Sequence, residues 1–168
     1  MLLKDEERKI INEAKVDPLK FDLIYRGYLQ EVFNFVRMRV RDVNSAEDIT
    51  AEVFFKAFKH LKSFRFEASF LTYLLRIALN ELFSLYRKKY KFQTIKEVSG
   101  EPDSDDFNEL RVAINKLPQK EREIIMMYFI ENRSMDEVRF ILNISKTSSY
   151  RLLKKALDML KREVEKDG

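Results

Sequence analysis

The sequence contains no cysteine, which excludes disulfide bonds, zinc sites with thiolate ligands and cysteine nucleophiles. Glycine and proline are scarce, at three each, so few residues are available that favour turns. There is one histidine and no glycine-rich phosphate loop. The N-terminus lacks a signal-peptide core, and the longest apolar run, Ile124–Ile130, is far shorter than the roughly 20 residues that cross a bilayer. We therefore expect a soluble cytoplasmic chain without cofactor, metal site or membrane span.

The sequence contains charged and apolar residues in the proportions of a globular protein. Of its 168 residues, 36% are charged and 45% are hydrophobic, which is typical of a folded protein. This length holds one ordinary domain or two small ones. The net charge is only +4, so the position of the basic residues says more about a nucleic-acid partner than their number.

Apolar residues recur at spacings of three and four along most of the chain, which predicts an all-α fold. The exception is Glu97–Glu109, with six acidic residues, no basic one, a glycine and a proline. We interpret it as a flexible acidic linker. The expected domains are 1–92 and 109–168, joined by 93–108. The expected helices are 4–15, 18–41, 45–62 and 69–91, then 107–116, 119–131, 134–142 and 145–165.

Residues 46–58, AEDITAEVFFKAF, form an amphipathic helix with a dense acidic face. One apolar seam is made by Ile49, Val53, Ala57 and Leu61, so part of this helix is core. The carboxylates have two readings. They favour the positive N-terminal end of a helix, and they also suit a partner-binding surface.

The expected helix 69–91 has leucines on one side and polar residues on the other. Its polar side ends in the basic run Tyr86–Lys91. Aromatic rings between cations suit unpaired nucleic acid, because rings stack on bases while cations hold phosphates. A solvated helix end gives the same pattern.

Near the C-terminus, Ser134 and Glu137 predict a capping box that opens a short helix. A tight turn and a longer helix follow, and from Arg139 to Arg162 there are seven basic residues and one acidic residue. This pattern predicts a helix-turn-helix whose second helix enters the major groove. An ordinary helical hairpin with a basic face is the alternative.

Four segments in order resemble the extracytoplasmic-function group of bacterial sigma factors, over roughly residues 18–165. The family's polymerase-binding helix reads approximately AEDLTQEVFLRAW, close to AEDITAEVFFKAF at 46–58. FRTWLYRIARN resembles FLTYLLRIALN at 70–80. LPxxEREVLxLRY resembles LPQKEREIIMMYF at 117–129, and ISxGTVKSRLxRAxxxL resembles ISKTSSYRLLKKALDML at 144–160.

The resemblance implies a non-enzymatic factor that binds core RNA polymerase through its β′ and β subunits. It would recognise promoter DNA as duplex and as melted strand, and assist strand opening. An anti-sigma protein is a further implied partner. The implied polymerase-binding residues are Glu47, Asp48, Thr50, Glu52 and Lys56. Those implied for melting and for the minus-ten element are Phe70, Tyr73, Arg76, Asn80, Arg87, Lys88 and Lys91, with the loop 65–69 beside them. Those implied for the upstream element are Lys146, Thr147, Tyr150, Arg151, Lys154 and Lys155.

The chain departs from the family pattern at several positions. Ala51 replaces a glutamine that helps to bind polymerase, and Tyr73 replaces a tryptophan. In the expected recognition helix, the usual glycine, valine, lysine and arginine are replaced by Thr147, Ser149, Tyr150 and Leu152.

Two other functions stay open: a dimeric helix-turn-helix regulator and a helical adaptor that binds only protein. A flexible linker suits separately docking modules better than a dimer with fixed half-site spacing.

Overall fold

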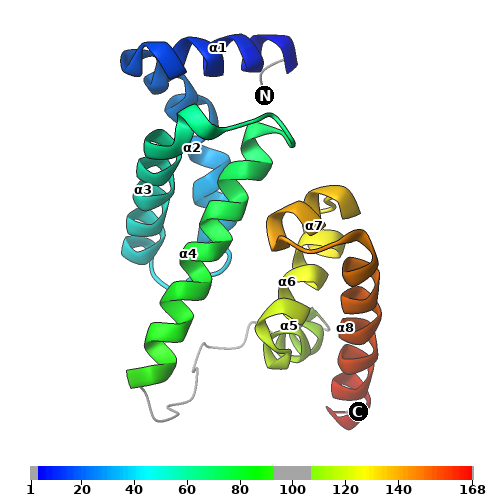
Figure 1. The fold of residues 1–168 in the computed structure, drawn as a ribbon. Coiled ribbons are helices and arrows are strands. Elements are labelled where there is room, and N and C mark those ends of the chain that lie inside the picture. The colour runs from blue at the N-terminus through cyan, green and yellow to red at the C-terminus, as the bar shows by residue number, and fades with distance from the viewer. Residues whose placement is uncertain (1–3, 93–106, 168) are drawn as a thin grey trace. The chain divides into compact units, whose positions relative to one another are not determined.

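The structure is a computed structural model that describes the backbone of residues 4–92 and 107–167 and the side chains of 5–88 and 110–166. Across these residues it is helical and contains no strand, as the apolar periodicity predicts (Figure 1). The chain divides into two compact units, 1–93 and 94–168. Most of the expected linker, residues 93–106, lies outside the described residues.

The first unit is built around three helices: α2 (Phe21–Arg37), α3 (Val43–His60) and α4 (Phe70–Phe92). Each packs against the other two. Helix α1 (Lys4–Val16) lies across one end of this bundle, as Figure 1 shows. Short 3₁₀ turns, η1 (Pro18–Lys20) and η2 (Leu61–Ser63), precede α2 and follow α3. The core where the three helices meet is mostly apolar, with Val32, Val53, Leu75 and Leu82 buried.

Two helix ends in this unit differ from expectation. Helix α2 ends at Arg37 rather than near residue 41, and the chain turns there, with Arg37 Nη1 donating to Val40 O at 2.9 Å. Helix α3 begins at Val43 because the Asp42 side chain, not Ser45, is the N-cap and accepts from Ser45 N at 2.7 Å. The expected start of this helix at residue 45 was therefore wrong.

The second unit contains α5 (Phe107–Lys116), α6 (Gln119–Ile125), α7 (Met135–Leu142) and α8 (Lys146–Asp167). Helix α8 packs against α5, α6 and α7 (Figure 1). The segment expected as one helix over 119–131 changes to a π-helical turn, η3 (Met126–Ile130), in which Glu131 N donates to Met126 O at 2.9 Å. The core around α8 includes Ile124, Met127, Ile141 and Ala156.

Within the described residues, no helix is long and apolar enough to cross a membrane.

Candidate functional site

The acidic face of α3 is exposed at Glu47 and Asp48 and half-exposed at Glu52. On the other side of the helix Ala46, Val53 and Ala57 are fully covered, whereas Ile49 of the expected seam is half-buried. Packing of that seam against α2 and α4 therefore fixes which way the carboxylates point. The result is a surface of negative charge that suits a basic partner.

Thr50 does not belong to this exposed face. Only 3% of its surface is accessible, and its hydroxyl donates to Ala46 O at 2.7 Å. The predicted polymerase contact of Thr50 is therefore corrected to a core position. Its hydroxyl is satisfied by the turn that precedes it, which lets the residue enter an apolar seam.

Lys56 is held between carboxylates of two helices. Its ammonium lies 3.5 Å from Glu52 Oε1 and also donates to Glu81 Oε1 on α4. The hydrogen bond to Glu81 is the main cause that raises the pKa of Lys56. Lys56 therefore joins α3 to α4 as well as bordering the acidic face.

The polar face of α4 carries Tyr73, Arg76 and Asn80, which follow one another at spacings of three and four residues. Asn80, Arg87 and Lys88 are exposed, whereas Tyr73 and Arg76 are half-buried. The Tyr73 ring packs against Phe64 at 5.0 Å and Phe70 at 5.5 Å between ring centroids. Its burial raises the pKa of Tyr73, so the phenol is neutral at physiological pH. Arg87 donates to Ser84 Oγ at 3.1 Å.

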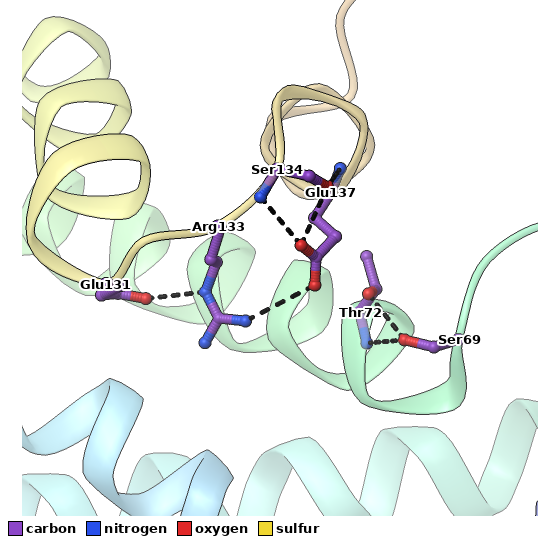
Figure 2. A network of polar contacts seen from close by, with 6 residues as sticks. All are labelled: Ser69, Thr72, Glu131, Arg133, Ser134 and Glu137. Atoms are coloured by element: carbon purple, nitrogen blue, oxygen red, sulfur yellow. Dashed lines mark hydrogen bonds and ion pairs between the residues drawn. The ribbon is translucent and has the colours of Figure 1, made fainter. Parts of the chain in front are cut away.

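Two residues in the first turn of α4, Phe70 and Thr72, are buried. Phe70 is fully covered and belongs to the core, which corrects its predicted DNA contact. Thr72 is 3% exposed, and its backbone N–H donates to Ser69 Oγ at 3.1 Å in the first turn of α4 (Figure 2). The backbone N–H groups of both residues lie in the first turn of α4, where they have no intrahelical partner and donate to side chains instead. The side chain of Lys91 lies outside the described residues.

The helix-turn-helix forms where the sequence predicts it. Ser134 and Glu137 make the capping box of α7, and Glu137 also approaches Arg133, which donates to Glu131 (Figure 2). Asn143 closes α7 in the left-handed conformation with φ 55°, which asparagine tolerates better than most residues.

The outward face of α8 carries most of its basic side chains. Lys146, Thr147, Tyr150, Arg151 and Lys154 are all exposed near its N-terminal half. Ser149 is fully buried, as its position on the helix predicts. A shallow groove along this helix is lined by Arg151, Lys154, Lys155, Asp158, Met159 and Arg162. This surface can present cations to phosphates and a few side chains to base edges.

Lys155 has a structural partner that sequence reasoning missed. Its Nζ lies 2.6 Å from Oε1 of Glu121, a buried residue of α6. The two residues are 34 positions apart, so no local spacing rule connects them. Lys155 is exposed and yet compensates a buried carboxylate.

The second feature that sequence reasoning missed is the contact of α1 with the loop before α4. Glu7 accepts from Phe70 N at 3.3 Å, and Lys15 Nζ donates to Phe64 O at 2.7 Å. Nothing in the spacing of either segment indicates these pairs.

Comparisons with known proteins cover most of the chain. The model of sigma-70 region 2 matches residues 24–92, and that of sigma-70 region 4 matches 107–160. The ECF RNA polymerase sigma factor SigX of Bacillus subtilis is 25% identical over 171 residues, covering 88% of each chain. SigM of the same organism is 25% identical over 154 residues, covering 85% of this chain and 94% of SigM.

Solved structures share the fold. CnrH, in complex with the cytosolic domain of CnrY, has a TM-score of 0.68 at 20% identity and covers 96% of this chain and 99% of its own. The sigma factor RpoE of Bartonella quintana, in complex with the anti-sigma factor NepR, has a TM-score of 0.65 at 21% identity, with 88% and 98% covered. With both sigma-70 regions matched in order and ECF relatives matched along most of their length, the chain belongs to the extracytoplasmic-function group of sigma factors, which direct RNA polymerase to promoters.

Proposed function

We propose that the three exposed faces divide the work of this promoter-specificity factor. The acidic face of α3, with Glu47, Asp48 and Glu52, contacts core polymerase. The α4 face captures the melted minus-ten strand. The N-terminal half of α8 docks on duplex DNA at the upstream element. The chain takes part in initiation by binding and positioning, without catalysing a reaction.

The observation that carries the proposal is the arrangement of Tyr73, Arg76 and Asn80 on α4. Their spacing of three and four places them on one side of the helix. Tyr73 offers a ring held by Phe64 and Phe70, Arg76 a cation, and Asn80 an exposed amide that both donates and accepts. An unstacked base needs a stacking surface, a hydrogen-bond partner and a charge for its phosphate.

This proposal is tested with Tyr73→Ala in holoenzyme. Run-off transcription on genomic fragments first supplies a promoter. Permanganate reactivity of thymines then measures strand opening, which we expect to slow about tenfold or more, since a stacked ring contributes roughly 1–3 kcal/mol per base. Tyr73→Trp, which keeps a ring, is the matched control. Opening by Tyr73→Ala at the wild-type rate, with an intact circular dichroism spectrum, would refute the role of this face.

The alternative of a dimeric operator-binding regulator is disfavoured by the region 2 match, which covers residues 24–92 of the first unit. An anti-sigma partner stays a prediction from the family. CnrH and RpoE were solved with such partner proteins, and co-purification of the chain from its own cells tests whether it has one.

A further inference from the structure

The loop between η2 and α4 contains a residue in an unfavourable conformation. Phe66 has φ 58°, in the left-handed region that bulky side chains rarely adopt. Such residues persist only where their surroundings hold them, and they gather at functional positions. The loop leads within seven residues to Tyr73, whose ring packs on Phe64 at the start of the same loop.

Helix α1 supplies the groups that hold this loop. Lys15 Nζ donates to Phe64 O at 2.7 Å and lies 4.8 Å from the centroid of the Phe66 ring. The Arg8 guanidinium lies 4.9 Å from the same centroid. Phe66 also meets Phe64 edge-on at 4.8 Å. Two cations from one helix therefore bind the ring that sits at positive φ.

The same helix also caps α4. Glu7 Oε1 accepts from Phe70 N at 3.3 Å and from the hydroxyl of Tyr28 on α2. Phe70 N is one of the amide groups that a helix start leaves without an intrahelical partner. Ser69 adds the local cap through Thr72 N (Figure 2). Both ends of the segment 64–70 are thus fixed by α1, at Phe64 O and at Phe70 N.

These contacts come from outside the part of the chain that the region 2 match covers, since α1 ends at Val16 and the match begins at residue 24. Lys15 and Glu7 are half-buried, and each hydrogen-bonds a backbone group of the loop or of the helix start. A helix that only covered the end of the bundle would not need these bonds. The contacts are directed at the conformation of one segment.

We propose that α1 is a positioning element for strand capture, with Lys15, Arg8 and Glu7 holding the Phe66 loop so that Tyr73 is presented to the unpaired strand. This rests on the proposed function of the α4 face. Lys15 acts through the loop and does not itself touch DNA. Loss of its ammonium releases Phe64 O and one side of the Phe66 ring, and the Tyr73 ring loses its fixed support.

The test compares Lys15→Met, which removes charge and donor at similar length, with Lys9→Met at an exposed position of the same helix. The probe is a fluorescent single-stranded oligonucleotide with the non-template strand of a promoter that the holoenzyme opens. We expect Lys15→Met holoenzyme to bind it about fivefold to tenfold more weakly, the range produced by losing a cation–π contact and a hydrogen bond. Core affinity and the affinity for duplex promoter in the closed complex stay unchanged, Lys15→Arg restores binding, and Lys9→Met has no effect.

A double-mutant cycle separates this inference from the proposed function. If both changes act through one ring, Lys15→Met adds little to Tyr73→Ala. Normal strand affinity in Tyr73→Ala would refute the α4 face itself. Reduced affinity in Tyr73→Ala with full affinity in both Lys15→Met and Arg8→Met would overturn only the role of α1. Parallel loss of core affinity in the α1 variants, including the milder Arg8→Met, would also overturn it, because α1 would then support folding in general.

Discussion

At the scale of single residues, neighbouring lysines of α8 have different surroundings. Lys154 and Lys155 are both exposed and adjacent, but only Lys155 reaches the buried carboxylate of Glu121. A buried carboxylate without its partner is costly, so replacing one lysine is not equivalent to replacing the other. Charge counted along the sequence does not distinguish them.

We expect Lys155→Ala to destabilise the second unit by roughly 1–3 kcal/mol, the cost of a buried polar group left without its partner. Lys154→Ala, the matched control, should leave the urea unfolding midpoint nearly unchanged. Both variants should weaken duplex binding at all sequences and reduce its salt dependence, because lysines at this face serve phosphates. Equal stability of the two variants would show that the ion pair with Glu121 contributes nothing measurable.

Arg151 is expected to act on base edges instead. Arg151→Ala should relax preference at one or two base pairs, at a cost of roughly 1–3 kcal/mol against the preferred site. Tyr150 is the other candidate for such contacts, since it is 52% exposed beside Arg151. Binding to a set of single-base promoter variants measures the effect. A uniform loss across that set would reassign Arg151 to phosphate contact.

For the acidic face of α3, we expect Glu52→Lys to weaken holoenzyme formation by about tenfold or more, as charge reversal at a charged interface costs several kcal/mol. The effect should diminish as salt rises. Glu31→Lys, an exposed reversal on α2, is the control. Fluorescence anisotropy with core polymerase gives both affinities. Unchanged core affinity in Glu52→Lys would remove α3 from the proposed interface.

At the scale of elements, helix ends are set by local side chains, and α7 shows this most directly. Ser134 Oγ accepts from Glu137 N at 3.2 Å, and Glu137 Oε2 accepts from Ser134 N at 2.9 Å (Figure 2). We expect Ser134→Ala to destabilise the second unit by about 1 kcal/mol, as measured by thermal unfolding. Ser134→Thr keeps an acceptor and should lose little. Equal losses in the two variants would show that the cap is not responsible.

Helix boundaries were predictable where such caps stand in the sequence. The capping box of α7 was confirmed. Asp17, beside Pro18, is a further local cap, since its side chain accepts from Leu19 N at the start of η1. The start of α3 was mispredicted because two acceptors, Asp42 and Ser45, lie three residues apart and the earlier one caps the helix. The π-helical turn at Met126–Ile130 could not be predicted from the local sequence, since its residues also suit an α-helix.

At the scale of the whole molecule, the chain consists of two units, 1–93 and 94–168, matched by two separate sigma-70 regions. Between the matched ranges lie most of the acidic residues of 97–109. We predict a role beyond spacing for them. Carboxylates without compensating cations repel RNA and are attracted to positive charge. We therefore expect this segment to occupy the basic cleft of the polymerase until RNA displaces it.

Neutralising Asp103, Asp105 and Asp106 to asparagine should therefore change the ratio of abortive to full-length transcripts more than promoter affinity. The same three changes to glutamate keep the charge and serve as the control. Gel analysis of initial transcripts and a promoter-binding titration are compared. A change in affinity alone would show a different role for the segment.

The sequence by itself determined the all-α class, most helix positions and the acidic and basic faces, because helical periodicity, caps and charge are local properties. Only the tertiary structure decided that Thr50, Phe70 and Thr72 are buried, since a helical pattern does not say how far neighbouring helices cover its edges. The decisive contacts join residues far apart in the chain. Glu7 and Phe70 N are 63 positions apart, Lys15 and Phe64 are 49 apart, and Lys155 and Glu121 are 34 apart. Packing brings these groups together, and no rule of sequence spacing reaches that far.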